Sequence, residues 1–248
     1  MSIVNRIDQR CYGKFQNYWD DTLFRQAILD HLQPDMQVLD MGAGAGIVSQ
    51  MNFRGLARKV CGVDPDSRVS QNPYLDEGKQ GVGEAIPYPD HSFDLVFTDN
   101  VLEHLETPQV VFAEVARVLK PGGVFLGKTP NRHHYMPLIA RMTPFWFHRW
   151  INLKRGRKEV DTFPTRYRAN TPTDLRRLAK GAGLTTGSIR LFEGRPEYLR
   201  FSAVTYVFGL AYERFVNFTE VLAPFRILII AAFIKPHHGE NSVPTRAE

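Results

Sequence analysis

Glycines and carboxylates follow two short apolar segments near the start of the chain. Val38–Met41 leads into a turn with glycine at positions 42, 44 and 46, and Asp64 ends a second apolar segment that begins at Val60. Glycine lets a ligand come close to the backbone because it carries no Cβ. An acidic side chain about 20 residues after such a turn can accept hydrogen bonds from both hydroxyls of a ribose. The pattern therefore predicts a pocket for a cofactor that contains adenosine.

The glycine spacing and the preceding carboxylate distinguish between adenosine cofactors. Dinucleotide turns usually read GxGxxG, and the helix N-terminus behind them faces a pyrophosphate. Here Gly42, Gly44 and Gly46 read GxGxG, and Asp40 lies just before them. That carboxylate would repel a pyrophosphate, whereas it could pair with an ammonium group. S-adenosyl-L-methionine (SAM) carries an ammonium and a ribose without phosphate, so we predict SAM; the alternative is an ordinary tight turn between a strand and a helix.

Apolar strands and amphipathic helices alternate around this turn. Such alternation favours a parallel sheet with helices on both faces, and ligands of these sheets bind at the carboxyl ends of the strands. Asp40, Asp64 and Asp99 all fall at such ends. We expect strands over residues 37–40, 59–64, 80–83, 93–98 and 124–129, with helices over 46–57 and 108–119.

Several short blocks within residues 36–130 occur in an order and spacing typical of one family. The blocks are Val38–Gly46, Gly62–Asp64, Gly83–Pro89, Ser92–Val96, Val101–Leu105 and Leu119–Gly123. On these blocks the chain resembles the class I SAM-dependent methyltransferases of type 11. The resemblance implies an α/β fold with a Rossmann-like, seven-stranded, mostly parallel sheet, helices on both faces, an antiparallel last strand and cap insertions. Strands over residues 184–192 and 227–234 would complete that sheet.

The resemblance also implies which residues bind SAM. It assigns the methionine part to Asp40 and the glycine turn, the ribose hydroxyls to Asp64, and the adenine to residues 84–86. Asp99 and Asn100 would lie near the sulfonium. The full set is Asp40, Gly42, Ala43, Gly44, Gly46, Asp64, Pro65, Glu84, Ala85, Ile86, Asp99 and Asn100.

Three histidines are candidates for a general base, which a neutral hydroxyl acceptor needs for methyl transfer. His104 lies in the Leu-Glu-His-Leu block, and His133 and His134 follow the strand over residues 124–129 at the expected mouth of the site. A neutral imidazole can take a proton near pH 7. Alternatively, His104 only shapes the pocket and the other two lie in a solvated loop. We predict no metal site, because the adjacent histidines have no third ligand at a suitable spacing.

The chain divides into five expected parts. Residues 1–35 are predicted to form a helical lid, 36–130 the SAM-binding core, and 131–170 a substrate-cap insertion. Residues 171–236 would hold the rest of the sheet with an aromatic helical insertion at 197–225, and 237–248 a tail. The aromatic insertion could cover an apolar substrate, lie in a membrane interface, where amphipathic rings are favoured, or pack into the core.

Composition describes a globular protein of 248 residues that is 43% hydrophobic and 23% charged. Its two cysteines, Cys11 and Cys61, support neither a disulfide framework nor a metal site. The longest apolar run, residues 227–234, is too short to cross a bilayer as a helix. We therefore expect a cytoplasmic protein that could contact the inner membrane face peripherally.

The net charge of +5 is concentrated in residues 147–200, which hold 13 basic against 5 acidic side chains. The densest part is Lys154–Lys158. This segment is either a solvated loop that favours solubility or a contact for an anionic membrane, lipid-linked sugar phosphate or nucleic acid. Nucleic-acid methylation is not expected, because Thr98–Val101 lacks the Asn-Pro-Pro-Tyr type of sequence that amino-methylating relatives carry there.

The favoured function is SAM-dependent O-methylation of a hydroxyl on a glycan, a lipid-linked sugar or a similar small molecule, with a histidine as general base. One alternative is methylation of an apolar quinone or terpenoid held by the aromatic segment. Another is a SAM-binding module that regulates a partner without turnover. The acceptor and the oligomeric state are not predicted from the sequence.

Overall fold

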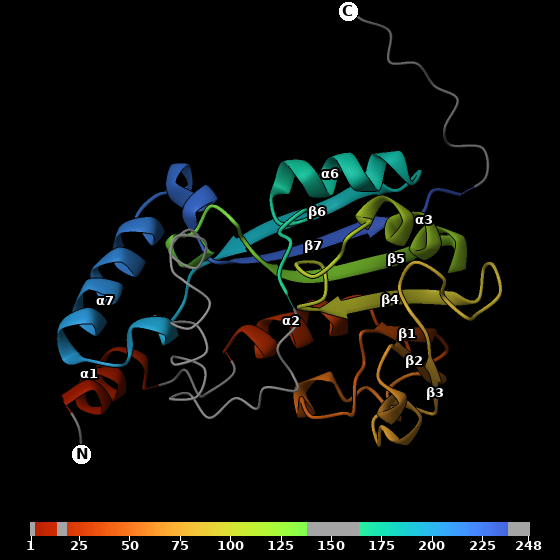
Figure 1. Ribbon diagram of the computed structural model, residues 1–248, viewed down its shortest axis with the longest axis horizontal. Helices are drawn as coiled ribbons and strands as arrows, with labels where there is room; N and C mark the ends of the chain where they lie inside the picture. The colour runs from red at the N-terminus through yellow and green to blue at the C-terminus, as the bar shows by residue number, and fades with distance from the viewer. Residues whose placement is uncertain (1–2, 14–18, 138–163, 238–248) are drawn as a thin grey trace, which may run out of the picture.

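A computed structural model describes residues 3–13, 19–137 and 164–237. Its centre is a seven-stranded sheet in the order β3-β2-β1-β4-β5-β7-β6 (Figure 1). Strand β7 runs antiparallel to both of its neighbours, and the other pairs are parallel. The mostly parallel sheet with an antiparallel last strand is therefore confirmed. The strands are β1 (Gln37–Met41), β2 (Lys59–Asp64), β3 (Glu77–Gln80), β4 (Phe93–Asp99), β5 (Leu119–Pro130), β6 (Thr185–Phe192) and β7 (Leu228–Ile234).

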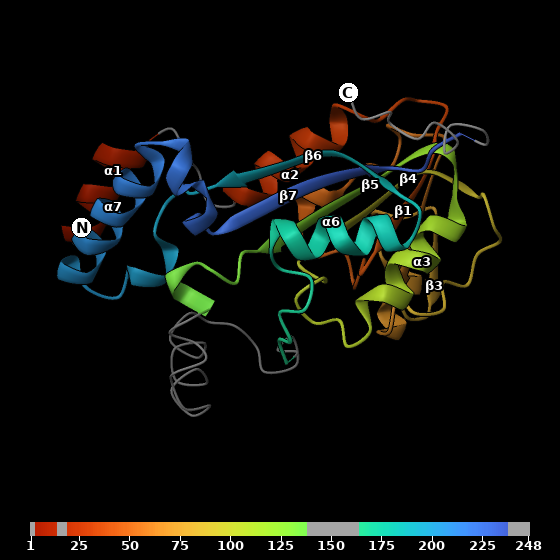
Figure 2. The same ribbon diagram turned by 90° about the horizontal axis from the view of Figure 1, so that it is seen from above.

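Helices cover both faces of the sheet and one of its ends. Figure 2 shows α2 on one face and α3 and α6 on the other. Helices α1 and α7 lie together beyond the carboxyl ends of the parallel strands in both views. The α-helices are α1 (Ile3–Tyr12), α2 (Trp19–Leu29), α3 (Pro108–Val118), α6 (Pro172–Gly181) and α7 (Ala203–Asn217). Short 3₁₀ turns are η1 (Ser49–Met51), η2 (Ser67–Gln71), η4 (Glu197–Leu199) and η5 (Glu220–Phe225).

The sheet separates two apolar cores. On the α3 side, Phe112 packs edge-to-face against Phe125 of β5, with ring centroids 5.4 Å apart. On the α2 side, Phe53 meets Phe97 of β4 at 5.3 Å. Successive strand residues face opposite sides of a sheet, so Phe125 and Leu126 enter different cores. This double burial explains why the central strands read as continuous apolar runs.

Hydroxyl side chains cap the N-termini of helices α6 and α7. Thr171 Oγ1 accepts a hydrogen bond from the Asp174 backbone N–H at 3.0 Å, so Thr171 is the N-cap of α6. Ser202 caps α7 in the same way through Thr205 N–H at 3.1 Å. Such caps satisfy backbone donors that have no partner within the helix.

The helix predicted over residues 46–57 does not form, and the turn η1 takes its place. Gly46 is left-handed at φ +73°, and Asn52 Oδ1 accepts from the Arg54 backbone N–H at 3.1 Å. This local side-chain bond competes with a helical hydrogen-bond pattern. Arg25 of α2 then donates to the carbonyl oxygens of Gln50 and Asn52 at 2.6 and 2.8 Å. The turn is thus stabilised by a neighbouring helix, which sequence periodicity does not reveal.

Other elements differ in their bounds. The third strand lies at 77–80 rather than 80–83, and β5 begins at Leu119 rather than near 124. The N-terminal segment holds two helices, α1 beside α7 and α2 on the sheet. Residues 138–163, which include Lys154–Lys158 and most of the predicted cap, lie outside the described residues, as do 238–248 of the predicted tail.

Candidate functional site

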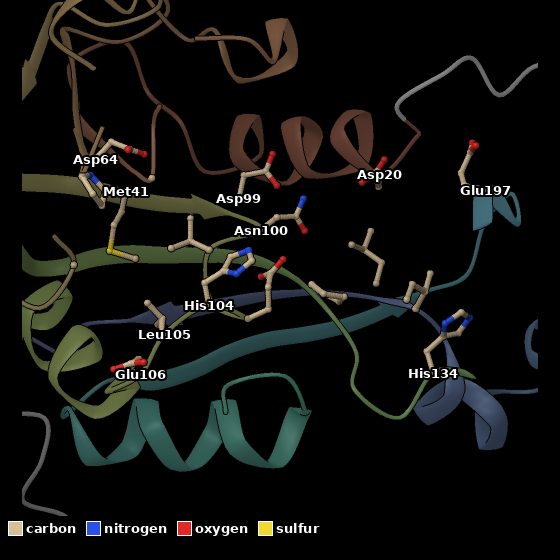
Figure 3. A pocket seen from close by; sticks show the side chains of 18 of the residues that line it. Asp20, Met41, Asp64, Asp99, Asn100, His104, Leu105, Glu106, His134 and Glu197 are labelled. Carbon is tan, nitrogen blue, oxygen red and sulfur yellow. The ribbon is translucent and has the colours of Figure 1, made fainter. Parts of the chain in front are cut away.

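A cavity of about 670 Å³ lies at the carboxyl ends of β1, β2, β4 and β5 (Figure 3). Its walls come from the loops after these strands, from the start of α2 and from the segment that precedes α7. Several residues predicted to bind the cofactor or act as a base line it. They are Gly42, Asp64, Pro65, Glu84, Asp99, Asn100, His104 and His134.

The glycine turn after β1 is held by packing that leaves no room for side chains. Gly42 has φ +92°, and a Cβ there would lie 2.2 Å from Val101 Cγ2. A Cβ on Gly46 would lie 2.3 Å from Asn72 Oδ1. The buried Asn72 amide donates to the carbonyl oxygens of Ala43 and Gly44 at 2.9 and 3.3 Å. Ala43, Gly44 and Gly46 therefore position the turn, while Gly42 reaches the cavity wall.

Asp64 is oriented by two backbone donors. Its Oδ2 accepts from Gly44 N–H at 2.9 Å and its Oδ1 from Asp66 N–H at 2.8 Å. Each carboxylate oxygen has a second lone pair, and the residue lines the cavity. The arrangement ties the glycine turn to the end of β2 and presents a fixed acceptor pair, as ribose recognition requires.

A buried lysine joins the cavity to the N-terminal helices. Lys128 of β5 is fully buried, and its Nζ lies 2.8 Å from Asp99 Oδ1, 3.3 Å from Asp20 Oδ2 and in contact with Asp21 Oδ1. Burial alone would lower the pKa of Lys128, but the three carboxylates outweigh it and raise that pKa. Burial raises the pKa of Asp99 to about 6, against the opposing effect of Lys128. Helix α2 is thereby held over the strand ends by an ion-pair cluster.

Negative charge is concentrated beneath the glycine turn. Asp40 is buried on β1 behind the cavity wall. Its pKa is raised well above its usual range, first by burial and then by the nearby carboxylates of Asp99 and Asp64. Asn100, which follows β4, adopts a left-handed backbone at φ +53°. Non-glycine residues in that region are uncommon and concentrate at functional sites.

The segment after β3 forms another wall. Gly81, Val82, Gly83 and Glu84 line the cavity, and Glu84 Oε1 accepts from Thr107 Oγ1 at 3.2 Å. Ala85 and Ile86, which were predicted to contact the adenine, do not line the cavity, since Ala85 is exposed and Ile86 is buried in the core. The Ile86 backbone N–H donates to Glu114 Oε2 at 2.9 Å, and its side chain is in the core.

The three candidate histidines occupy different surroundings. His104 points toward the middle of the cavity, whereas His134 lies at the end opposite Asp64 (Figure 3). Because the Pro164 carbonyl can only accept, its 3.1 Å contact with His104 Nδ1 assigns the His104 proton to Nδ1 and makes Nε2 the basic nitrogen. His133 is exposed and does not line the cavity.

His134 is hydrogen-bonded at one ring nitrogen, and the other lies near Glu193 without a hydrogen bond to any residue that the structure describes. Its Nδ1 accepts from the Met136 backbone N–H at 3.2 Å, so the proton of the neutral ring lies on Nε2. That nitrogen is 3.3 Å from Glu193 Oε2, and the side chain is almost fully buried. Tyr135 stacks on it with ring centroids 4.1 Å apart. This environment favours a structural role for His134.

Glu103 was not among the candidates from sequence, yet it lines the cavity. Asn170 Nδ2 donates to Thr129 Oγ1 at 2.7 Å, and Thr129 Oγ1 donates to Glu103 Oε2 at 3.1 Å. Burial raises the pKa of Glu103 to about 7. The position of Glu103 beside His104 in the Leu-Glu-His-Leu block could have indicated it as a candidate. Its hydrogen-bond chain through Thr129 to Asn170 could not be predicted, because these residues are far apart in sequence.

Comparison with known proteins identifies a domain family within the chain and several similar proteins. The methyltransferase domain model of type 11 matches residues 39–127. A Mycolicibacterium smegmatis protein described as an S-adenosylmethionine-dependent methyltransferase is 34% identical over 137 residues, which is 52% of this chain and 51% of that protein. Residues 39–127 therefore carry a methyltransferase domain of type 11, and over about half of its length the chain is similar to a SAM-dependent methyltransferase. The cofactor of this family is SAM, as predicted.

Two further similar proteins bear on acceptor and fold. The ubiquinone biosynthesis O-methyltransferase of Thiobacillus denitrificans is 30% identical over 159 residues, covering 60% of this chain and 65% of that enzyme. A Haloferax volcanii protein described as a methyltransferase, solved with the Trm112 methyltransferase activator, shares the fold with a TM-score of 0.60 at 17% identity. That match covers 94% of this chain and 96% of the other. The chain spans about half the length of the M. smegmatis relative.

The residues of the cavity fit SAM. The turn at Gly42 has no space for a Cβ beside Val101, so the backbone itself forms that wall. Asp64 presents oriented acceptors to the cavity. Burial and then the carboxylates of Asp99 and Asp64 raise the pKa of Asp40, and a ligand that carries ammonium and sulfonium charges would favour the ionised form of this cluster. Within the described ranges, no group of three or more acidic, histidine or cysteine side chains could hold a metal ion.

Proposed function

We propose that the protein transfers a methyl group from SAM to a hydroxyl oxygen of a small-molecule or lipid-linked acceptor. The observation that carries this proposal is the single cavity that joins Gly42 and Asp64 at one end to Glu103 and His104 farther along. The first pair belongs to the cofactor blocks of the family, and the second pair offers groups that can take a proton. A binding module without turnover would have no need of the second pair.

The cofactor end supplies binding and orientation. Asp64 would accept hydrogen bonds from the ribose hydroxyls, Asp40 and the glycine turn would face the methionine part, and the wall at Gly81–Glu84 would contact the adenine. Asp99 and Asn100 would lie near the sulfonium. When bound, SAM supplies an activated methyl group for in-line displacement, in which the bond from carbon to sulfur breaks as the bond to the acceptor oxygen forms. Positioning is therefore the main task of these residues.

His104 is the proposed general base. The contact of its Nδ1 with the Pro164 carbonyl makes Nε2 the nitrogen that would take the hydroxyl proton. Removing that proton during the displacement raises the nucleophilicity of the oxygen, and such a base typically contributes about 10²–10⁴-fold in rate. Glu103, with its pKa raised to about 7 by burial, is the neighbouring group that could take the proton instead. His134 would stabilise the loop after β5 through Met136 and Glu193.

The lining of the acceptor side supports two acceptor classes. Glu103, Glu106 and Glu197 line it, and ionised carboxylates accept hydrogen bonds from hydroxyl groups. They favour the hydroxyl of a glycan or lipid-linked sugar. The second candidate is a ring hydroxyl of a quinone-type molecule. Trp19 and Tyr198 also line the cavity, and a relative of 30% identity is a ubiquinone biosynthesis O-methyltransferase.

The proposed acceptor classes include membrane lipids, so we further propose that the protein works in the cytoplasm with peripheral contact to an anionic membrane. None of the helices in the described part of the chain has the length and apolar character that crossing a bilayer requires.

The test uses methyl-labelled SAM with the full chain and a cell extract split into lipid, glycan, protein, nucleic-acid and small-molecule pools. We expect label in the lipid, glycan or small-molecule pool. Asp64→Ala should weaken SAM affinity about tenfold or more, equal to about 1.4 kcal/mol, while Thr185→Ala at the far sheet edge should leave it unchanged. Label only in nucleic acid or protein, or SAM binding without label in any pool, would contradict the proposal.

The same assay assigns the base. His104→Asn should lower turnover about 10²-fold or more while calorimetric affinity for SAM persists. His133→Asn, an exposed histidine of the neighbouring loop, is the matched control and should keep turnover. If Glu103→Gln loses turnover and His104→Asn does not, the base is Glu103.

A further inference from the structure

On helix α7, polar side chains face the protein and apolar side chains face outward, which is the reverse of a typical helix on a protein surface. Its buried face includes Tyr206 and Glu213. Tyr206 Oη donates to Asp8 Oδ1 of α1 at 2.6 Å, and Tyr12 Oη donates to Glu213 Oε2 at 3.0 Å. Helices α1 and α7 are therefore joined by hydrogen bonds between polar side chains. Surface helices usually bury their apolar stripe instead.

The apolar stripe of α7 faces outward. With 3.6 residues per turn, Val204, Val207, Phe208 and Phe215 fall on one side of α7, and two phenylalanines flank its ends. Phe208 is 70% exposed and Phe218 is 87% exposed. A contiguous exposed apolar patch of this kind marks an interaction site more often than chance exposure. The outer face consists of Phe201, Val204, Val207, Phe208, Phe215 and Phe218.

The charge on the same pair of helices has one sign. Within α1 and α7, the exposed ionisable side chains are Arg6, Arg10 and Arg214. The acidic side chains of these helices are turned inward. Asp8 pairs with Arg195 at 2.9 Å and with Arg200 at 3.2 Å, and Glu213 is buried. A helix pair that exposes aromatic and arginine side chains complements an anionic lipid surface, where apolar rings insert and cations meet phosphate groups.

We propose that the outer face of α7, together with the arginines of α1 and α7, docks the protein on the surface of a bilayer that contains anionic lipids. The partner is the lipid surface itself, because the exposed ionisable side chains of α1 and α7 are all basic and the exposed apolar side chains lie on one stripe. This inference assigns the membrane contact of the proposed function to a definite surface. The choice of a membrane as the partner also rests on the proposed function.

The docking face lies at the same end of the molecule as the cavity. Helices α1 and α7 stand beyond the carboxyl ends of the parallel strands (Figures 1 and 2). Glu197 and Tyr198 of η4 line the cavity, and Phe201 of the docking face follows three residues later. Docking through α7 would therefore hold the cavity near the bilayer, from which a lipid-linked or apolar acceptor could enter.

The test is co-sedimentation of the full chain with vesicles, in the absence of SAM and acceptor. Vesicles of phosphatidylcholine with phosphatidylglycerol should sediment the protein, and vesicles of phosphatidylcholine alone should do so much less. The double variant Phe208→Ser/Phe215→Ser should weaken binding about tenfold or more, because each ring loses its buried contact with lipid. The triple variant Arg6→Gln/Arg10→Gln/Arg214→Gln should remove the preference for the anionic vesicles.

The matched control is Val110→Ser, which changes an exposed apolar residue on α3. It should bind vesicles like the wild type. Vesicle binding that is unchanged in the Phe208/Phe215 variant would overturn the proposal. So would absence of wild-type binding, and if sedimentation velocity then showed a dimer that this variant dissociates, the face would be a contact between copies of the chain. Because vesicle binding needs no turnover, its failure leaves the labelled-SAM assay unaffected.

Discussion

The cofactor end of the sheet and helix α7 are opposite exceptions to the rule that ionisable side chains are exposed and apolar side chains are buried. Beneath the glycine turn, the ionisable side chains of Asp40 and Lys128 are buried, and Asp99 is mostly buried beside Lys128. On α7, Phe208 and Phe218 are exposed although they are apolar. Buried charges and exposed apolar patches are the informative exceptions in a folded protein. Here both exceptions occur at the carboxyl ends of the parallel strands, where the fold places ligands.

The two regions differ in what compensates the exception. The buried lysine has three carboxylate partners inside the protein, so most of its desolvation cost is offset within the chain. Asp40 lies beyond that cluster, and burial raises its pKa well above its usual range, with the carboxylates of Asp99 and Asp64 adding to the effect. A bound cation would stabilise the carboxylate of Asp40, and contact with an apolar surface would cover the outer face of α7. The difference suggests that one region is completed by the cofactor and the other by the membrane.

The largest expected effect comes from Lys128→Met. The change leaves Asp21 and Asp99 buried without their cation, which should cost about 3–5 kcal/mol in the free energy of unfolding. Both carboxylates would then have pKa values raised further, so the stability of the variant is retained at low pH and lost as pH rises. Urea denaturation near pH 5 and pH 8 should therefore show the larger deficit at pH 8.

Lys120→Met is the control for that variant, because it lies on the same strand. Lys120 Nζ is 2.8 Å from Asp94 Oδ2, but both side chains are partly exposed. A pair of this kind typically contributes about 0–1 kcal/mol. Equal losses in the two variants would show that burial of charge does not set the cofactor end apart.

Glu103→Gln should produce a smaller effect, with the opposite sign. Burial raises the folded-state pKa of Glu103 to about 7, above its usual value of about 4.3. The stability linked to its proton is therefore complete at low pH and is lost as pH rises through 7. Glutamine keeps an acceptor for Thr129 and never ionises. The variant should match the wild type near pH 5 and exceed it near pH 8 by up to about 3 kcal/mol.

Urea denaturation without SAM measures this difference, and Glu106→Gln is its control because Glu106 is exposed and lies in the same loop. That control should show no gain between pH 5 and pH 8. If Glu103→Gln raised the free energy of unfolding equally at both pH values, the gain would come from packing. Burial of the ionised Glu103 carboxylate would then carry no cost in stability.

The cofactor end could be predicted from sequence much further than the rest. The glycine turn and Asp64 are encoded within about 30 consecutive residues, where spacing alone defines strand, turn and strand. The seven-stranded, mostly parallel sheet with an antiparallel last strand came with the family resemblance and is confirmed, whereas the order of the strands was not predicted. The failure at residues 46–57 has a tertiary cause, since Arg25 of α2 stabilises a turn where local periodicity favoured a helix.

The acceptor end could not be predicted in the same way, because its contacts join distant parts of the chain. Glu103 depends on Thr129 and Asn170, and His104 on Pro164. The aromatic segment was expected to be helical, but composition leaves open which side of a helix faces the protein. That side is decided by Tyr206 and Glu213 meeting α1, a contact across about 200 residues of sequence.

The smallest expected effect is the sharpest test of the contrast between the two regions. Phe208→Ala removes an exposed ring and should change the free energy of unfolding in water by no more than about 0.5 kcal/mol. Phe112→Ala removes a fully buried ring from the α3 core and should cost about 3–5 kcal/mol. Urea denaturation of both variants, without vesicles, compares the same chemical change in the two environments. A loss for Phe208→Ala close to that for Phe112→Ala would mean that the ring is covered within the protein, and α7 would then have no apolar face to offer a membrane.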